Sequence, residues 1–404
     1  MQQTHTAVFA QSLGKQVSSR LGPKMQPRLT AYPSAPLPLE PRWDLLQQPH
    51  LPVSEWERLS TLLWLAAGPI RQEVLNPYKL HRSSPSPRSL FPVHLHVETR
   101  EALWHHDPFY AELRPDRTVG TPPSRPTTLW ITGFVPGIPE NYGTLRPTLV
   151  ALEGGHLLHT LQESAHLLGY RLRTEILEET PPEVLHTLHL DDQWRVLARV
   201  DLLEDPLHFE TADPTAFQAM LTRSSGHGVG GLCASNRTLD FDELQDLLFP
   251  TLPCHPELPG FRLLVSLRTG PLKADLLELH PDGFLSLLQP EQSVQVLQQA
   301  YGYSPLNCNF GALEALIYLV MDYPKALQTH SFQAIQVLLG QYAQALGLQA
   351  ARAGRFVRPA RAFQEVALDT PLRLQPSEMV AYLLLLGEDR LPDLAFPLYT
   401  EVHA

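Results

Sequence analysis

The sequence predicts an α+β protein made of two fused copies of one unit, each with an antiparallel or mixed sheet flanked by long buried helices. Its 404 residues exceed what one core usually organises, because domains cluster near ~100–200 residues. Hydrophobic residues make up 43% of the chain and charged residues 18%, which supplies enough apolar side chains for real cores. Elements of the first half also recur in the same order in the second half, which indicates a duplication.

Each half begins with a short amphipathic helix followed by an alternating strand. The helix at Val53–Trp64 matches Asp240–Phe249, since both place leucine pairs at helical spacing behind an acidic first turn. Apolar residues then alternate with other residues from Phe91 to Val97 and again from Phe261 to Leu267. This alternation predicts two strands that each bury one face.

Two further strands are predicted in each half. Phe109–Arg117 and Leu276–Gly283 both end in a proline–aspartate turn signal, so each is expected to form a hairpin with the strand before it. The apolar runs that start at Thr128 and Ala315 predict the next strand of each half.

Long helices and closing strands complete the repeat. The segments that start at Arg146 and Ser331 predict long, mostly buried helices that stop at Gly169 and Gly354. A closing strand is predicted at Leu190–Leu202 in the first half and at Gln375–Gly387 in the second.

The repeat divides the chain into three parts. Residues 41–205 are predicted to form the first unit and residues 206–404 the second, with the boundary near Leu203–Asp213. Residues 1–40 are polar and proline-rich, so this arm either contacts a peptide leader or is disordered.

Charge and hydropathy exclude several classes of protein. The formal charge of −11 argues against a nucleic-acid binder, because neutralising phosphates requires clustered Lys and Arg. The N-terminus has no apolar core of signal-peptide length, and no apolar run approaches the ~20 residues that cross a bilayer. We therefore expect a cytoplasmic protein without a membrane partner.

Neither histidines nor cysteines predict a metal site. His94 and His96 share one face of a predicted strand, a spacing that metal sites use, but no third ligand stands at a recognisable spacing. Cys233, Cys254 and Cys308 show no CxxC spacing. We expect no bound metal and unreactive cysteines.

Residues Arg82–Val97 contain a proline–serine pair followed by an apolar–proline step. This segment resembles the Pro-Ser signature of the SagB-type dehydrogenases, which are part of the nitroreductase superfamily. Pro87 and Arg88 stand where that signature has small residues. The matching residues are Pro85, Ser86, Leu90, Phe91 and Pro92.

A second segment, from Asn141 to Leu161, resembles the same family. Asn141 replaces the lysine that the family has at this position. The matching residues are Tyr142, Gly143, Arg146, Gly155 and His156.

The resemblance implies a nitroreductase-like fold in both units and an FMN-dependent dehydrogenase that oxidises thiazoline or oxazoline rings in a peptide. Hydride would pass to FMN, and oxygen would reoxidise the flavin. Tyr142 and Arg146 are the candidate catalytic residues, since a tyrosine hydroxyl could relay the proton released as the ring becomes aromatic. The alternative for Tyr142 is a packed side chain at a helix entrance.

The family pattern also suggests how one FMN is held. Its phosphate is bound by an RxS element, because guanidinium and hydroxyl groups donate charge-assisted hydrogen bonds to a dianion. His227 replaces the last cation of this element, and Pro253–His255 replaces the Pro-Ser pair in the second half. The family draws the two elements from opposite subunits, so we expect an intrachain pseudo-dimer with one composite site. The RxS residues are Arg223, Ser224 and Ser225.

Four further arginines are candidate cofactor ligands. The loop Ala353–Glu365 resembles the family segment beside the flavin N5 edge, and an arginine there could stabilise the reduced, anionic cofactor. Salt bridges to Glu365 or Asp369 are the alternative role. The residues are Arg355, Arg358, Arg361 and, beyond the second closing strand, Arg390.

Two rival functions remain open. A general flavin reductase would take electrons from NAD(P)H and pass them to nitroaromatics or quinones. A non-catalytic member of a biosynthetic complex would keep only a peptide-docking surface. The expected partners are a peptide substrate and a cyclodehydratase complex, and the fused chain could be a monomer or a higher homo-oligomer.

Overall fold

The computed structural model describes most of the chain. The predicted arm at residues 1–40 and the predicted boundary at Leu203–Asp213 lie almost entirely outside the described residues. His227 and Glu365 also lie outside them. The described residues are 37–46, 54–74, 76, 78–116, 125–203, 214–226, 232, 234–270, 273–280, 282–283, 285–301, 304–361, 363–364, 366–390 and 395–398.

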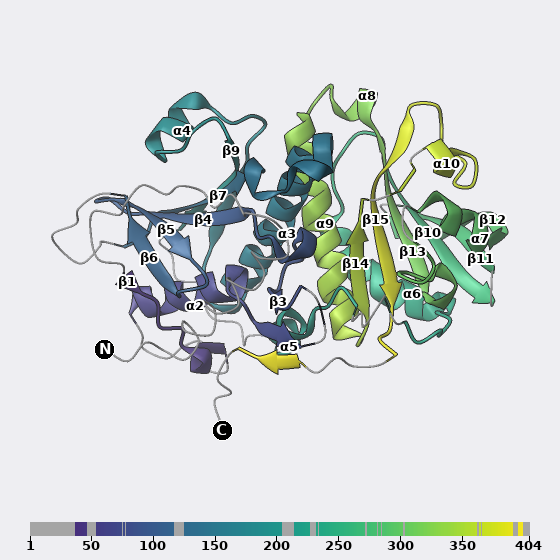
Figure 1. Ribbon diagram of the computed structural model, residues 1–404, viewed down its shortest axis with the longest axis horizontal. Helices are drawn as coiled ribbons and strands as arrows, with labels where there is room; N and C mark the ends of the chain where they lie inside the picture. Colours follow the sequence, from purple (N-terminus) through teal and green to yellow (C-terminus); the bar gives the residue numbers. More distant parts are fainter. Residues whose placement is uncertain are drawn as a thin grey trace. The chain divides into compact units, whose positions relative to one another are not determined.

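These residues form two compact units, each with its own sheet (Figure 1). The first unit comprises the described parts of Met1–Glu73, Tyr78–Leu221 and Ala395–Ala404. The second comprises those of Val74–Pro77 and Thr222–Leu394. The α+β class predicted from the sequence is confirmed.

The first unit is built on a seven-stranded antiparallel sheet in the order β1-β6-β5-β4-β7-β9-β8. A small second sheet has the order β16-β2-β3. The strands are β1 Leu37–Pro38, β2 Arg71–Glu73, β3 Leu80–His81, β4 Val93–Glu98, β5 Leu103–Asp107, β6 Glu112–Pro115, β7 Thr128–Phe134, β8 Leu172–Ile176, β9 Trp194–Leu202 and β16 Ala395–Pro397.

Helix α3 packs against β4, β7 and β9 of this sheet and against α2. The α-helices are α2 Glu55–Ala67, α3 Arg146–Leu167, α4 Pro182–Thr187 and α5 Pro214–Thr222, and the 3-10 helices are η1 Trp43–Leu46, η2 Pro87–Ser89, η3 Val135–Gly137 and η4 Glu140–Leu145.

The second unit has a six-stranded antiparallel sheet in the order β12-β11-β10-β13-β15-β14, and α9 packs against β14 and β15. The strands are β10 Phe261–Gly270, β11 Lys273–Leu279, β12 Leu285–Ser293, β13 Ala315–Asp322, β14 Phe356–Ala360 and β15 Glu378–Gly387. The helices are α6 Phe241–Leu248, η5 Phe249–Cys254, α7 Val294–Ala300, η6 Phe310–Ala312, α8 Tyr323–Ala326, α9 Phe332–Arg352 and α10 Val366–Asp369.

Apart from the edge strand β1, the two large sheets have the same strand order. In chain order both read third, second, first, fourth, sixth, fifth. Each also carries a β-bulge on its closing strand, with Leu197 as the extra residue in β9 and Ala381 in β15. Beside these bulges, Leu95 of β4 and Leu263 of β10 occupy matching positions. A shared bulge is a specific feature, so the match supports a duplicated unit.

Matching capping boxes explain why corresponding helices begin where they do. Ser54 accepts a hydrogen bond from the backbone N–H of Glu57, whose carboxylate accepts one from the Ser54 N–H. Asp240 and Glu243 make the same reciprocal pair at the start of α6. Each pair satisfies two backbone donors that the first turn leaves open.

The second strand of the first unit was assigned to the wrong segment. Phe109–Arg117 forms a turn and the third strand, β6, whereas the hairpin partner of β4 is β5. In the second unit, Leu276–Gly283 does contain most of the hairpin partner, β11. The segment predicted as the loop Ala353–Glu365 likewise contains a strand, β14, which pairs with β15.

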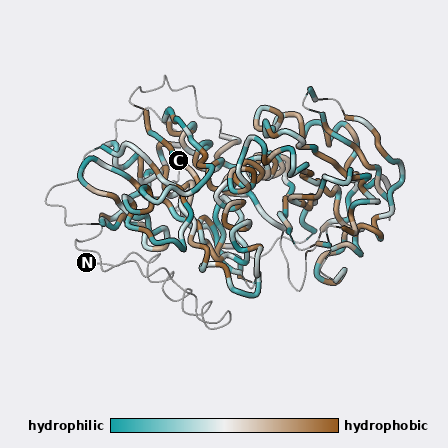
Figure 2. The backbone as a smooth tube through the Cα atoms, turned by 90° about the horizontal axis from the view of Figure 1, so that it is seen from above, coloured by the Kyte–Doolittle hydropathy of each residue, from teal (hydrophilic) through white to brown (hydrophobic). Residues whose placement is uncertain are grey.

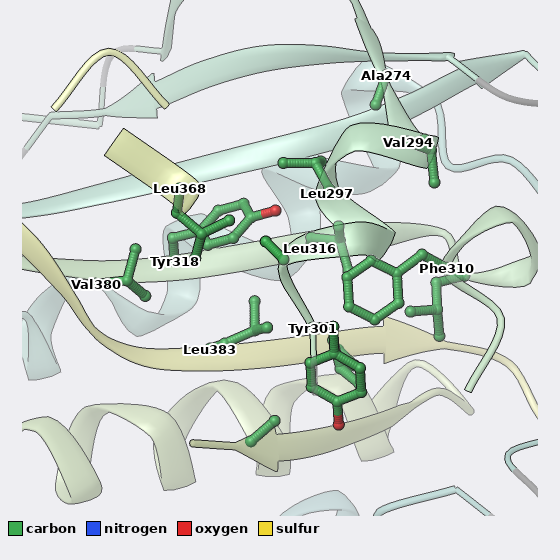
Figure 3. Close-up of a cluster of buried hydrophobic side chains, with 14 of the residues drawn as sticks. Ala274, Val294, Leu297, Tyr301, Phe310, Leu316, Tyr318, Leu368, Val380 and Leu383 are labelled. Carbon is green, nitrogen blue, oxygen red and sulfur yellow. The ribbon is translucent and has the colours of Figure 1, made fainter. Parts of the chain in front are cut away.

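Buried apolar side chains fill both units, and apolar stretches run along the chain in each (Figure 2). In the second unit, one core lies on the face of the sheet that α7 and α10 cover (Figure 3). Tyr318 and Leu316 of β13 meet Leu383 of β15 and Leu297 of α7 there.

In the first unit, α3 approaches the sheet closely through a glycine. A Cβ at Gly154 would lie 2.3 Å from a methyl carbon of Leu197, the bulge residue of β9. The contact fixes the rotation of α3 on the sheet, and the residue before Gly154 is therefore held in the interior.

Candidate functional site

The Pro-Ser element of the first unit lies at the start of a tight loop, residues 86–91, which we call the Ser86 loop. Ser86 is extended, with φ −136° and ψ 139°, and its hydroxyl oxygen accepts a hydrogen bond from the Phe91 backbone N–H at 2.8 Å. The same hydroxyl donates to the Glu153 carboxylate at 2.7 Å. Ser86 therefore joins the two ends of its own loop and links them to helix α3.

Three residues of this loop have left-handed backbone conformations. Arg88, Ser89 and Phe91 have φ values of 50°, 50° and 52°. Such conformations cost about 1–2 kcal/mol each for residues with a side chain. The hydrogen bonds of Ser86 and a further one from the Ser89 hydroxyl to the Leu80 carbonyl, at 2.8 Å, offset part of this strain. Strain of this kind is common at binding sites.

Glu153 is an unusual residue for the buried side of a helix. It is 4% exposed, and burial raises the pKa of its carboxyl to about 8. The Ser86 hydrogen bond, the charge of Arg82 and the backbone N–H of Val93 act in the opposite direction. The carboxyl is thus predominantly protonated at neutral pH, and it can either donate or accept a hydrogen bond.

Arg82 lies under the same loop. It is 4% exposed, with its guanidinium carbon 4.1 Å from the centre of the Phe91 ring and 5.6 Å from that of Phe109. Burial lowers its pKa to about 10, and the charges of Glu153 and Asp107 partly counter this. Arg82 remains a cation at neutral pH.

Four histidines lie in β4 and β5 of this unit. The rings of His94 and His96 lie 5.3 and 5.0 Å from that of His105, on the face opposite α3, while His106 points to the other face. Burial lowers the pKa of His96 to about 4 and that of His106 to about 3. All are therefore neutral at pH 7. Within the described part of the chain, no three His, Cys, Asp or Glu side chains could together hold a metal ion.

Tyr142 and Arg146 lie at the entrance to α3. Tyr142 is half-buried, and the guanidinium carbon of Arg88 from the Ser86 loop lies 5.3 Å from the centre of its ring. Arg146 opens the helix and donates to the Val135 carbonyl at 3.3 Å, while its buried Nε has no hydrogen-bond partner among the described residues. Gly143, with φ 52° and ψ −130°, makes the turn between them. The structure thus brings Tyr142 beside the Ser86 loop.

The RxS element of the second unit lies beside β14. Arg223 is 2% exposed, and it donates to the Ser225 hydroxyl at 3.2 Å. The Ser224 carbonyl accepts the backbone N–H of Val357 at 3.2 Å, and the Ser224 hydroxyl accepts that of Gly226 at 3.0 Å. This strand contact places a buried cation and hydroxyl groups together in one turn.

Arg355 is engaged in an ion-pair network of the second unit. It donates to Glu314 at 2.8 Å and to Glu243 at 3.0 Å, and its side chain is 9% exposed. Burial acts to lower its pKa, but the hydrogen bonds and charges of both carboxylates outweigh burial and raise it. Its described contacts are those of a structural cation, with carboxylates other than the expected Glu365 or Asp369.

The other three arginines do not gather around it. Arg358 lies on β14 between Phe356 and Ala360, on the face of the α7–α10 core. Arg361 stacks over the Phe363 ring at 5.0 Å. Arg390 is exposed, three residues after β15.

Sequence reasoning missed Glu153 and Arg82, which the structure adds to the Ser86 loop. Glu153 is the only charged residue between Arg146 and Gln162 in an otherwise apolar and small-residue helix. A single carboxyl on a helix predicted to be mostly buried is a signal that could have identified it.

Within the described ranges, no helix has the length and apolar character needed to cross a bilayer.

Comparison with solved structures identifies the fold. A provisionally assigned nitroreductase from Anabaena variabilis matches 95% of this chain and 99% of its own, with a TM-score of 0.72 and 16% identity. The chain therefore has a nitroreductase-like fold over nearly its full length. One from Ralstonia eutropha matches 45% of this chain and 88% of its own, with a TM-score of 0.30 and 17% identity.

The E. coli microcin synthetase McbBCD complex with truncated pro-MccB17 bound matches 57% of this chain and 92% of the compared chain, with a TM-score of 0.33 and 11% identity. No protein-family model matches the sequence. No curated protein matches it either.

Proposed function

We propose that this protein is an FMN-dependent oxidoreductase that converts azolines to azoles in a peptide. The observation that carries the proposal is the nitroreductase-like fold across the whole chain, which has Ser86 and the RxS turn in its two halves. The azoline part rests on the sequence resemblance around Ser86 and Tyr142.

The residues present suit a flavin phosphate. A dianion favours a desolvated guanidinium with neighbouring hydroxyl donors, and Arg223 with Ser225 offers that set. Arg146 adds a buried Nε–H that no described residue accepts, at the helix entrance of the first unit. We propose that Arg223, Ser224 and Ser225 hold a flavin phosphate and that the Ser86 loop contacts a bound flavin.

When bound, FMN supplies a hydride acceptor for two-electron oxidation. Tyr142 would relay the proton that leaves the azoline ring as it becomes aromatic, its oxygen accepting that proton while its own hydrogen passes to water. The Arg88 cation beside its ring would favour negative charge on the phenolic oxygen while the proton is transferred. The strained Ser86 loop would keep Arg88 and Ser86 in fixed positions during the reaction.

The proposal makes the azoline peptide the substrate, so the reaction before it must be a cyclodehydration of a Ser, Thr or Cys residue. A cyclodehydratase complex in the cytoplasm is the partner that we propose on this basis.

Variants in the two proposed elements test cofactor binding. We expect Arg223→Ala and Ser86→Ala to weaken FMN binding, measured by quenching of FMN fluorescence as protein is added. Arg373→Ala, at an exposed arginine of the second unit, and Thr187→Ala, at an exposed hydroxyl of α4 in the first unit, are the controls. Unchanged affinity in both Arg223→Ala and Ser86→Ala would refute the assignment.

A second assay distinguishes the substrate. Incubation of the FMN-loaded protein with a thiazoline-containing peptide should remove two hydrogen atoms from the peptide, as read by mass spectrometry. The Anabaena variabilis neighbour supports a rival, an NAD(P)H-dependent reductase of nitroaromatics or quinones. NADPH oxidation with a nitroaromatic acceptor, without any change in the peptide, would favour that rival.

A further inference from the structure

The Ser86 hydroxyl has a single hydrogen, and one of its two partners can change its hydrogen-bonding role. It has one hydrogen to donate and two lone pairs to accept with. The Phe91 backbone N–H occupies one lone pair at 2.8 Å, and the Glu153 carboxyl lies 2.7 Å away on the other side. The protonation state of Glu153 therefore decides where the Ser86 hydrogen points.

When Glu153 is ionised, it can only accept, so Ser86 donates its single hydrogen to the carboxylate. When Glu153 is neutral, its own hydroxyl can donate to the second lone pair of Ser86. The Ser86 hydrogen is then free to point at a ligand. The Phe91 contact is the same in both states, so the loop need not move.

We propose that Glu153 is a positioning residue whose proton controls whether Ser86 can donate a hydrogen bond to the bound cofactor. The identity of that cofactor as FMN rests on the function proposed above. The hydrogen-bond exchange itself rests on the contacts among Glu153, Ser86 and Phe91.

Several charged and titratable groups surround Glu153. Arg82 keeps its charge below a pKa of about 10, and His106, His94 and His96 are neutral above pKa values of about 3 to 4. Asp107, at the end of β5, faces Arg82, and burial raises its pKa. Charged and titratable groups on the elements around Glu153 include Arg82, Arg88, His94, His96, Glu98, His105, His106, Asp107 and, on α3 itself, Arg146, His156 and His159.

The buried position of Glu153 distinguishes proton control from a role limited to holding the Ser86 loop. Glu153 is 4% exposed and lies between the sheet and the Ser86 loop. Water therefore cannot easily take the place of Glu153 as the hydrogen-bond partner of Ser86. A role limited to holding the loop would be satisfied by any hydrogen-bonding side chain at this position. A proton-controlled role requires a group that titrates.

The affinity for FMN should be higher at low pH than at high pH. Below the pKa of about 8, Glu153 is neutral and Ser86 can donate to the cofactor. Above it, the donor is lost to the carboxylate and cofactor affinity falls. We expect the dissociation constant for FMN to rise about tenfold, which is the usual effect of losing one hydrogen bond.

The test compares FMN affinity from about pH 6 to about pH 9 in wild type, Glu153→Gln and Ser86→Ala. The glutamine amide donates at every pH, so Glu153→Gln should bind as wild type does at low pH, without the transition near pH 8. Ser86→Ala should bind weakly at all pH values. Thr187→Ala, at an exposed hydroxyl of α4, keeps the Glu153 contact and should show the wild-type profile.

Retention of the transition near pH 8 in Glu153→Gln or Ser86→Ala would overturn the inference while leaving the proposed function intact. If no variant binds FMN, the proposed function fails. The infrared band of a protonated carboxyl then still tests Glu153: it should titrate near pH 8, shift in Ser86→Ala and vanish in Glu153→Gln. A band that Ser86→Ala leaves unchanged would overturn the inference.

Discussion

The two units share a strand order and differ in how they keep polar groups in their interiors. The first unit holds several of them neutral, since burial lowers the pKa of His96 and His106 and raises that of Glu153, while the buried Arg82 stays charged. The second holds them charged and paired, as in Arg355 with Glu314 and Glu243. The same scaffold therefore accommodates neutral buried groups in the first unit and a buried ion-pair network in the second.

The difference extends to the proposed cofactor elements. When Gly155 is aligned with Gly340, Leu338 stands in α9 where α3 has Glu153. The second unit also has η5, with Cys254, where the first has the Ser86 loop. It therefore lacks both the serine and the carboxyl, which agrees with a single functional site per chain.

The largest expected effect comes from disrupting the ion-pair network of Arg355 in the second unit. Arg355→Ala would leave Glu314, whose side chain is 0% exposed, without its hydrogen-bonded cation. Such a loss typically costs about 3–5 kcal/mol in the free energy of unfolding. Urea unfolding with hydrogen exchange of β13 and β14 measures it, and a cost below about 1 kcal/mol would contradict the assigned role.

Its matched control removes both charges. Arg355→Leu combined with Glu314→Leu should recover most of the stability, because no unpaired charge remains in the interior.

Acid should unfold the first unit before the second. His96 and His106 have folded pKa values of about 4 and 3, below the ordinary 6.5, so their stabilisation is complete above pH 6.5 and is lost as the pH falls. Each contributes about 1.4 kcal/mol per pH unit, and together they outweigh Glu153, whose single proton acts in the opposite direction.

Hydrogen exchange of β4 and β5 against β10 and β11 at decreasing pH checks this order of unfolding. His106→Leu should reduce the acid sensitivity, and it should also stabilise the unit, since neither ring nitrogen has a hydrogen-bond partner among the described residues. Equal protection of both units as the pH falls would contradict the comparison.

Alkali should weaken the first unit by a smaller amount. The folded pKa of Glu153 is raised to about 8, so its contribution is complete below the unfolded value of 4.5 and declines as the pH rises towards 8. Between pH 6.5 and pH 8 the expected loss is about 1.4 kcal/mol per pH unit. Thermal unfolding of wild type and Glu153→Gln across this range tests it, since the variant should show no slope from this residue.

The smallest expected effect is one that both units share. Ser54→Ala and Asp240→Ala each remove one capping box and should each cost about 1 kcal/mol in the free energy of unfolding. Chemical denaturation of the two variants side by side measures both losses. A clear cost at one cap and none at the other would weaken the equivalence of α2 and α6.

Local signals made much of the fold predictable. Leucine spacing, acidic first turns and glycine stops predicted α2, α3, α6 and α9, because each of these signals acts within one or two turns. Both predicted glycine stops, Gly169 and Gly354, have the left-handed φ values that end helices, 72° and 70°.

Two strands that the sequence did not predict, β5 and β14, lack a regular apolar alternation. Residues Leu103–His106 of β5 are buried on both faces, so apolar and polar residues do not alternate there. β14 contains Pro359, which is tolerated because the strand lies at the edge of its sheet. Pairing between distant strands decides such elements.

The candidate site was predictable only in part. The Pro85–Ser86 and Arg223–Ser225 motifs are contiguous in sequence and could be found by resemblance. The Glu153 contact joins residues 67 positions apart, and it depends on how α3 rotates on the sheet. Arg358 and Arg361 do not lie together, because side chains alternate between the two faces of β14 and Arg361 follows the end of that strand.

The most direct test of the central claim is the visible absorbance spectrum of the purified protein, with the released cofactor quantified. The account predicts a flavin spectrum and about one FMN per chain, as expected when only one unit keeps the Ser86 loop. A colourless protein that takes up no flavin from added FMN would contradict it.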